Sequence, residues 1–230
     1  DIINIKGLHQ FGSFNYEIPG DISSASFFIV LTLLAEKSKL LIKKTNINPT
    51  RIGIIKILKK MNAKILYKNK KYYKGEAVAD IYVESSNNIK SIKCPSSLNS
   101  SAIDEFLIIF LVAAKAKGIS TFKSLGELNM KESPRLNIAI KILRKIGVKV
   151  LRVKNDIKIF GQPNLNLKGT YEIKNFRKDH RVFMMTSIAG LTLGGNWKIY
   201  DTDSVKTSFP TFFKILDQLG AKVNWKLEKI

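Results

Sequence analysis

A nine-residue segment recurs with variations at three places along this chain of 230 residues. Its copies are ILKKMNAKI at 57–65, ILRKIGVKV at 142–150 and ILDQLGAKV at 215–223, spaced 85 and 73 residues apart. Each copy predicts the end of a helix, a left-handed turn at Asn62, Gly147 or Gly220, and a following strand. The spacing exceeds a solenoid repeat of about 20–50 residues, so we expect three copies of one supersecondary unit to close around a common axis.

Each copy also carries a second set of helix and strand signals. Polar clusters that suit the start of an apolar helix occur at 23–27, 100–106 and 178–182. Strands are expected next, at 40–45, 119–125 and 197–201, and proline marks the start of a second helix at 48–51, 132–135 and 207–210. Further strands are expected at 80–84 and 157–160. The unit is therefore helix-strand-helix-strand-strand, the fold class is α/β (α+β), and an insertion at 68–79 in the first copy forms an exposed hairpin or loop.

Arginine is scarce in this chain, with 6 residues against 33 lysines. Three of the arginines, Arg51, Arg135 and Arg181, fall within the first turn of a predicted helix. Helix N-termini favour anions, and the guanidinium fork holds a carboxylate or phosphate through two parallel hydrogen bonds. The pattern indicates a protein that binds small, multiply charged anions.

The net charge of +21 could instead indicate a nucleic acid or membrane partner. The lysines are scattered through all three copies, and aromatic residues do not alternate with them as in a base-stacking surface. The apolar runs at 27–35 and 106–114 have about half the ~20 residues that span a bilayer. A single cysteine, Cys94, cannot form an internal disulfide and fits a reducing cytoplasm. We therefore expect a cytoplasmic protein with neither a nucleic acid nor a membrane partner.

Equivalent helix starts in a threefold arrangement point to one side and should converge on a common face. The polar and charged residues expected there are Ser23, Ser24, Arg51, Asp104, Glu105, Lys131, Glu132, Arg135, His180, Arg181, Lys206 and Thr207. Asp104 could be a helix cap, and Glu132 could be a first-turn acid that stabilises the helix dipole. Alternatively, one carboxyl group accepts a proton from a substrate hydroxyl while the other delivers a proton elsewhere. The sequence alone leaves both readings open.

Signals for metal or nucleotide cofactors are missing from the sequence. The two histidines, His9 and His180, have no cysteine partners for a zinc site, and no carboxylate cluster has calcium-loop spacing. No glycine-rich phosphate loop and no serine nucleophile elbow occurs. We expect no cofactor and no metal, with any chemistry performed by positioned side chains.

Seven segments, taken in order, resemble the 5-enolpyruvylshikimate-3-phosphate synthase family, also called 3-phosphoshikimate 1-carboxyvinyltransferase. They are PGDISSA at 19–25, NPTR at 48–51, GEAVADI at 75–81, IDE at 103–105, LGEL at 125–128 leading into KES at 131–133, DHR at 179–181 and TSFP at 207–210. Each segment alone is a weak signal, but together they cover essentially the whole chain.

The resemblance implies an inside-out α/β barrel, the enolpyruvyl transferase fold, in which helices lie inside and sheets outside. The family has two such halves joined by a hinge. Residues 1–17 would be the tail of a missing N-terminal domain with its hinge, and residues 18–230 the C-terminal domain. The implied partner is the N-terminal half of the same enzyme, and the complete protein is expected to be a monomer.

The implied reaction transfers the enolpyruvyl group of phosphoenolpyruvate to the 5-hydroxyl of shikimate 3-phosphate and releases phosphate, a step toward chorismate and the aromatic amino acids. By resemblance, Asp104 takes the hydroxyl proton with help from Lys131, and Glu132 protonates the methylene carbon of phosphoenolpyruvate. The residues implied to bind substrate are Arg135, Arg181, His180 and Lys206. This chain alone is expected to be inactive, because the substrates of the family lie between two closing halves.

The sequence departs from the family pattern at two places. Pro134 replaces an acidic residue between Ser133 and Arg135, and Ser208 shifts the register of Lys206 by one residue. Two other functions remain open at this stage. One is the UDP-N-acetylglucosamine enolpyruvyl transferase reaction, and the other is a non-catalytic basic module derived from the same fold that binds anions or nucleic acid.

Overall fold

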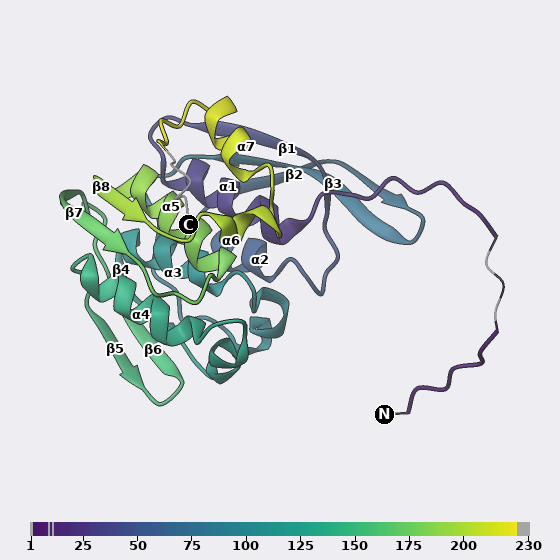
Figure 1. The fold of residues 1–230 in the computed structure, drawn as a ribbon, viewed down its shortest axis with the longest axis horizontal. Helices are drawn as coiled ribbons and strands as arrows, with labels where there is room; N and C mark the ends of the chain where they lie inside the picture. Colours follow the sequence, from purple (N-terminus) through teal and green to yellow (C-terminus); the bar gives the residue numbers. More distant parts are fainter. Residues whose placement is uncertain (1, 9, 11, 225–230) are drawn as a thin grey trace.

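The computed structural model describes residues 2–8, 10 and 12–224. Its main body contains three successive copies of a helix-and-strand unit, and an extended N-terminal segment leaves this body beside a long hairpin (Figure 1). This segment holds no helix or strand before Gly20 in its described residues. The prediction that residues 1–17 belong to another domain is not tested by this arrangement and stays a prediction.

The first copy forms a three-stranded antiparallel sheet in the order β1-β3-β2. Its elements are α1 (Ile22–Leu34), β1 (Lys39–Asn46), α2 (Gly53–Lys60), β2 (Lys64–Tyr73) and β3 (Glu76–Glu84). Val83 in the central strand lies opposite Leu40 of β1 and Ile65 of β2. Strands β2 and β3 form a hairpin with its turn at Lys74 and Gly75. Of the exposed hairpin or loop expected for residues 68–79, the hairpin is formed, but Ala77, Val78 and Ala79 are buried in it.

The second copy repeats this sheet as β4-β6-β5, again antiparallel. Two short 3-10 turns, η1 (Ser96–Leu98) and η2 (Ser100–Ala102), lead into α3 (Phe106–Lys115), β4 (Gly118–Phe122), η3 (Gly126–Met130), α4 (Arg135–Lys145), β5 (Val150–Val153) and β6 (Asp156–Gly161). The central strand places Ile159 opposite Ser120 and Val150, as Val83 is placed in the first copy. The helix expected from residue 100 therefore starts later, at Phe106.

The third copy differs in its sheet, where β7 and β8 pair in parallel. Its elements are β7 (Leu167–Ile173), α5 (His180–Leu193), β8 (Gly194–Ile199), α6 (Asp203–Lys206) and α7 (Phe212–Gln218). The strand expected at 221–223 is not formed, since residues 221–224 carry no regular structure. Any continuation of this strand lies outside the described residues.

An extended segment precedes the first helix in every copy, which the sequence patterns did not predict. Gly20 pairs in parallel with Thr45, Lys90 with Lys117 and Lys93 with Thr121, and in the third copy the same position is the full strand β7. In the first two copies these pairings are isolated bridges, too short to give a strand pattern. The unit therefore begins with a parallel extended segment that the helix-strand-helix-strand-strand order omits.

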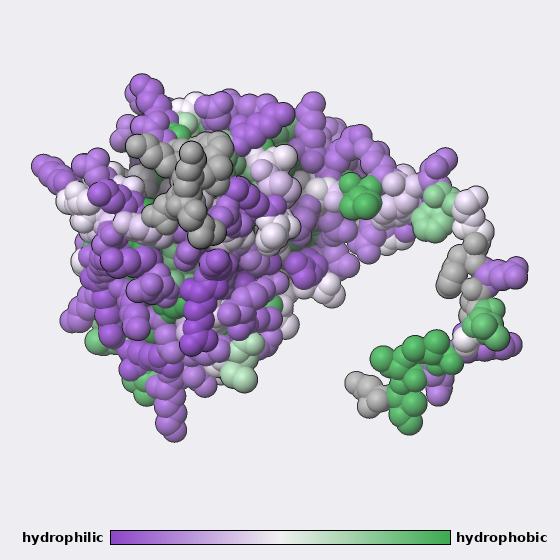
Figure 2. All heavy atoms as spheres, in the orientation of Figure 1, coloured by the Kyte–Doolittle hydropathy of each residue, from purple (hydrophilic) through white to green (hydrophobic). Residues whose placement is uncertain are grey.

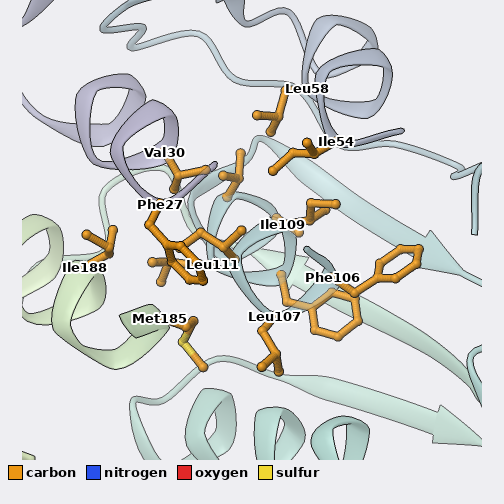
Figure 3. Close-up of a cluster of buried hydrophobic side chains, with 14 of the residues drawn as sticks. Phe27, Val30, Ile54, Leu58, Phe106, Leu107, Ile109, Leu111, Met185 and Ile188 are labelled. Atoms are coloured by element: carbon orange, nitrogen blue, oxygen red, sulfur yellow. The ribbon is translucent and has the colours of Figure 1, made fainter. Parts of the chain in front are cut away.

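The first helices of the three copies, α1, α3 and α5, contact one another at the centre, and the sheets lie around them (Figure 1). Figure 3 shows the side chains that fill this centre, including Phe27 and Val30 of α1, Leu107 of α3, and Met185 and Ile188 of α5. These helices are apolar on nearly every side because protein surrounds them. The arrangement agrees with the inside-out barrel expected for the fold.

The turns after the second helices adopt the predicted left-handed conformation. Asn62, Gly147 and Gly220 have φ values of 71°, 80° and 84°. Each of these residues lies two positions after the last residue of its helix, which confirms the helix ends expected from the repeated nine-residue segment.

Candidate active site

The starts of the central helices are joined by a continuous network of charged and hydroxyl side chains. Ser23 of α1 donates a hydrogen bond to Glu105, just before α3, over an Oγ–Oε1 distance of 2.5 Å. Arg135 of α4 donates from Nε to Asp179, just before α5, at 2.9 Å. Arg181 of α5 returns to the second copy and donates from Nη1 to the main-chain oxygen of Asp104 at 3.0 Å. All three copies therefore contribute to one cluster.

Arg135 is the centre of this cluster and its side chain is only 1% exposed. Its guanidinium group contacts Asp179, Asp104 at 3.3 Å from Nη1, and Glu132 from Nη2. The chain reaches this position because Pro134, with φ of −71°, directly precedes the first residue of α4. Asp104 and Glu132, the two predicted catalytic acids, are thereby held on one guanidinium group.

Asp179 ends the loop before α5 and caps this helix. Its Oδ1 accepts the main-chain N–H of Arg181 at 2.9 Å, while Oδ2 accepts both Arg135 and the hydroxyl of Ser133, the latter at 2.7 Å. Burial on its own would raise the pKa of Asp179, but the hydrogen bond and charge of Arg135, with the Ser133 hydroxyl, hold that pKa below its ordinary value. Asp179 is therefore a buried, ionised anchor.

Arg181 approaches both acids that precede α3. Its Nη2 lies 3.5 Å from Asp104 Oδ2, and its Nη1 lies 3.8 Å from Glu105 Oε1. The Asp104 side chain is 22% exposed, and α3 has no side-chain cap. Asp104 is thus not the helix cap that the sequence left as an alternative, because its carboxylate is held by Arg135 and Arg181 instead.

Glu105 is the most deeply buried acid on the side of the first copy, with a side chain 3% exposed. Burial raises the pKa of its carboxyl group, although the Ser23 hydrogen bond and the charges of Arg181 and Arg51 oppose the rise. Arg51 donates from Nη2 to the Oγ of Ser23 at 2.9 Å. Arg51 precedes α2 by two residues, so the prediction that it lies in the first helical turn is wrong.

The remaining predicted site residues, Lys131, His180 and Lys206, make other contacts. Lys131 Nζ pairs with Glu127 at 3.2 Å, and Lys206 Nζ pairs with Asp203 at 2.6 Å. His180 is the first residue of α5, where burial and Arg181 lower its pKa and favour the neutral imidazole at pH 7. Their roles toward a substrate stay predictions.

The structure adds two residues that the sequence patterns did not single out, Ser133 and Asp179. Both lie in segments that carry the family resemblance, KES at 131–133 and DHR at 179–181, and this was the signal that could have identified them as site residues. Among residues 2–8, 10 and 12–224, no group of three or more His, Cys, Asp or Glu side chains is arranged to hold a metal ion. Within the same residues, none of the helices has the length and apolar character needed to cross a bilayer.

Comparison with known proteins gives consistent similarities. The family model described as EPSP synthase (3-phosphoshikimate 1-carboxyvinyltransferase) matches residues 1–216. Proteins named 3-phosphoshikimate 1-carboxyvinyltransferase from Ruthia magnifica and Geobacter metallireducens are each 38% identical, over 96% and 95% of this chain. The chain covers 50% of each of these relatives, so it spans about half their length.

Solved structures give the same result. An EPSP synthase from Acinetobacter baumannii superimposes with a TM-score of 0.83 at 33% identity, over 91% of this chain and 48% of that one. The enolpyruvyl transferase NikO from Streptomyces tendae superimposes with a TM-score of 0.66 over 88% of this chain and 43% of that one. Its identity is 14%, so it supports the fold alone. These likenesses confirm the predicted enolpyruvyl transferase fold.

Proposed function

The chain belongs to the EPSP synthase family, and on this premise we propose that it supplies the C-terminal half of a site that joins phosphoenolpyruvate to shikimate 3-phosphate. The observation that carries the proposal is the meeting of Asp104, Glu132, Arg135 and Arg181 in one cluster. Glu132 and Arg135 are neighbours in sequence, but Asp104 and Arg181 lie 77 positions apart, so their contact depends on how the copies pack. The cluster combines acids able to move protons with cations able to hold anions.

In the proposed reaction, the 5-hydroxyl oxygen of shikimate 3-phosphate forms a bond to C2 of phosphoenolpyruvate. Asp104 accepts the hydroxyl proton, and Glu132 delivers a proton to the methylene carbon, C3. Glu132 then takes a proton back from C3 while the bond from C2 to the phosphate oxygen breaks, which releases phosphate and restores the double bond. Asp104 and Glu132 can take separate parts because they contact different nitrogens of Arg135, Nη1 and Nη2.

The arginines and His180 would bind the substrates. Arg181 offers a guanidinium fork that is 14% exposed, and Arg135 stabilises the acids from the buried side. His180 would act as a neutral hydrogen-bonding group, as its lowered pKa favours. Lys131 would have to exchange Glu127 for the substrate hydroxyl, and Lys206 would have to exchange Asp203 for a substrate anion.

The N-terminal segment supports the expectation of a second half. Five of its apolar side chains are more than two-thirds exposed: Ile2, Ile3, Ile5, Leu8 and Phe14. Figure 2 shows hydrophobic residues along the segment that extends away from the main body. Exposed apolar residues in succession are typical of a surface that another domain covers. We expect the chain alone to be inactive, because water reaches a cluster that a second half would enclose.

The test combines this chain with the half of the Ruthia magnifica relative that it does not match, and measures phosphate release from the two substrates. We expect release only when both halves are present, and loss of release with Asp104→Asn or Glu132→Gln. Glu172→Gln, which changes an acid on the outer strand β7, is the matched control and should leave release unchanged. Normal release by this chain alone, or by both site variants, would contradict the proposal.

A further inference from the structure

Arg51 differs from the other two arginines of the cluster because no carboxylate of the described residues pairs with it directly. Arg135 and Arg181 both contact carboxylates, whereas no ion pair in the described part of the chain includes Arg51. One of its nitrogens, Nη2, donates to Ser23, and the residue is exposed. A guanidinium group has five N–H donors, and the one side-chain hydrogen bond of Arg51 within the described residues, to Ser23, uses one of them.

The charges of the cluster make this difference important for anion binding. Four carboxylates, those of Asp104, Glu105, Glu132 and Asp179, surround the guanidinium groups of Arg135 and Arg181. An incoming anion must compete with these carboxylates for either arginine. The Arg51 side chain instead donates to the Ser23 hydroxyl and forms no ion pair within the described residues, so an incoming anion competes there with the more distant charge of Glu105.

The position of Arg51 is fixed at both its main chain and its side chain. Asn48 accepts the Arg51 N–H at its main-chain oxygen over 2.8 Å, and its side chain accepts the Thr50 N–H at 3.0 Å. Gly53 then passes so close to the second copy that a Cβ there would lie 2.5 Å from the carbonyl carbon of Ser101. The loop is thereby held against the segment that leads to Asp104 and Glu105.

Ser23 connects Arg51 to the buried carboxylate. The hydroxyl hydrogen of Ser23 goes to Glu105, so its lone pairs are available for Arg51. Glu105 also faces Arg181 at 3.8 Å. One buried carboxylate of the second copy therefore orients an arginine of the first copy, through Ser23, and an arginine of the third copy directly.

We propose that Arg51 is a further anion-binding residue of this site, and that Ser23 and Glu105 are positioning residues that hold it beside Arg181. The ligand is an oxyanion, phosphate or carboxylate, carried by a substrate. The inference deepens the proposed function and rests on it. By this inference, the part of the cluster that the first copy contributes, Arg51 and Ser23, takes part in substrate recognition.

Calorimetric titration of the 230-residue chain with inorganic phosphate, and separately with pyruvate, tests this proposal at low ionic strength. We expect Arg51→Ala to weaken binding of at least one of these anions about tenfold, the loss of a charge-assisted two-point contact. Arg51→Lys should recover only part of this loss, because lysine keeps the charge but lacks the fork. Weakening with phosphate alone or with pyruvate alone identifies the group that is bound.

Arg144→Ala is the matched control, since it removes the same charge at the far end of α4, where Arg144 Nη2 contacts the main-chain oxygen of Val150. It should leave anion binding unchanged. Ser23→Ala should weaken binding less than Arg51→Ala, and the double variant should bind as Arg51→Ala does, because Ser23 acts through Arg51. Additive losses in the double variant would overturn the positioning role.

Two results would overturn the inference while leaving the proposed function intact. One is equal anion affinity in Arg51→Ala and the unsubstituted chain, and the other is no measurable anion binding by the unsubstituted chain, each with normal phosphate release in the two-half experiment. Conversely, weakened anion binding in Arg51→Ala together with no release by the two halves would support the inference and contradict the proposed reaction.

Discussion

The junction between the first and second copies and the junction between the second and third use the same three kinds of side chain. Each has an arginine from the start of a second helix, a serine hydroxyl, and a buried acid that precedes a central helix. They are Arg51, Ser23 and Glu105 at one junction, and Arg135, Ser133 and Asp179 at the other. The order of contact differs, because Ser23 stands between Arg51 and Glu105 while Arg135 reaches Asp179 directly.

This difference in the order of contact goes with pKa shifts of opposite direction in the two acids. Direct contact with Arg135 holds the pKa of Asp179 below its ordinary value, despite burial. Glu105 receives a hydroxyl hydrogen bond but has its nearest arginine nitrogen 3.8 Å away, and burial raises its pKa. Because Ser23 stands between Arg51 and Glu105, Arg51 neutralises this acid less than Arg135 neutralises Asp179. Arg51 in turn keeps more N–H donors for a ligand.

The largest effect should come from removing the arginine that is fully buried. We expect Arg135→Leu to lower the free energy of unfolding by about 3–5 kcal/mol, because Asp179 is left as an unpaired buried charge. Urea denaturation at pH 7 measures this change. Arg51→Ala should alter stability by less than about 0.5 kcal/mol, as for an exposed residue. Equal losses in the two variants would show that the junctions are energetically alike.

Asp179→Asn tests the same junction from the side of the acid. Loss of a hydrogen-bonded charge beside Arg135 should lower the free energy of unfolding at pH 7 by about 1.5–3 kcal/mol. Because the folded-state pKa of Asp179 is lowered, its stabilisation is present above the unfolded value of about 4 and is lost as pH falls below it. The difference between variant and unsubstituted chain should therefore shrink on acidification. A difference that grows toward low pH would contradict the assignment of Asp179 as ionised.

Gly53→Ala tests how tightly the first junction is closed. The added methyl group meets the main chain of Ser101, so the loop that carries Arg51 must move, and we expect a loss of about 1–3 kcal/mol in thermal or urea unfolding. Gly12→Ala is the control, since its Cβ would have no atom within 4 Å. An unchanged stability of Gly53→Ala would show that the two copies can separate here without strain.

The smallest effect, with the opposite sign, is expected for Glu105→Gln. The amide keeps an acceptor for Ser23 and removes a buried charge, so the free energy of unfolding at pH 7 should rise by less than about 1 kcal/mol. A raised folded-state pKa means that the contribution of Glu105 is present below the unfolded value of about 4.3 and is lost as pH rises through the folded value. The advantage of the variant should therefore appear only as pH rises. A variant that is less stable than the unsubstituted chain at pH 7 would show that Glu105 is stabilised as an anion.

Much of the fold could be predicted because its signals are local. The left-handed turns at Asn62, Gly147 and Gly220 and the polar starts of α1 and α5 depend on residues within a few positions of one another. The late start of α3 and the parallel segments before each central helix were not predicted. In the first two copies the parallel pairings are single bridges between residues such as Lys90 and Lys117, which leave no period in the sequence, whereas the third copy has the full strand β7.

The candidate site was predictable only in part for the same reason. Asp104, Glu132, Arg135 and Arg181 were identified by type and by resemblance, and the structure places them in contact. Ser133 and Asp179 were missed because their importance comes from burial beside Arg135, and Asp179 lies 44 positions from that arginine. Their roles in a reaction remain proposals.

The sequence by itself determined a threefold unit with apolar central helices and charged residues at the helix starts, because hydrophobic periodicity and helix caps act over a few residues. Only the tertiary structure decided which arginine meets which acid. Ser23 and Glu105 are 82 positions apart, and their contact depends on how two copies pack. The distance between an arginine of one copy and a carboxylate of the next decides whether the guanidinium group neutralises that carboxylate or keeps its donors for a ligand. This distance depends on how the copies pack, and no local sequence pattern encodes it.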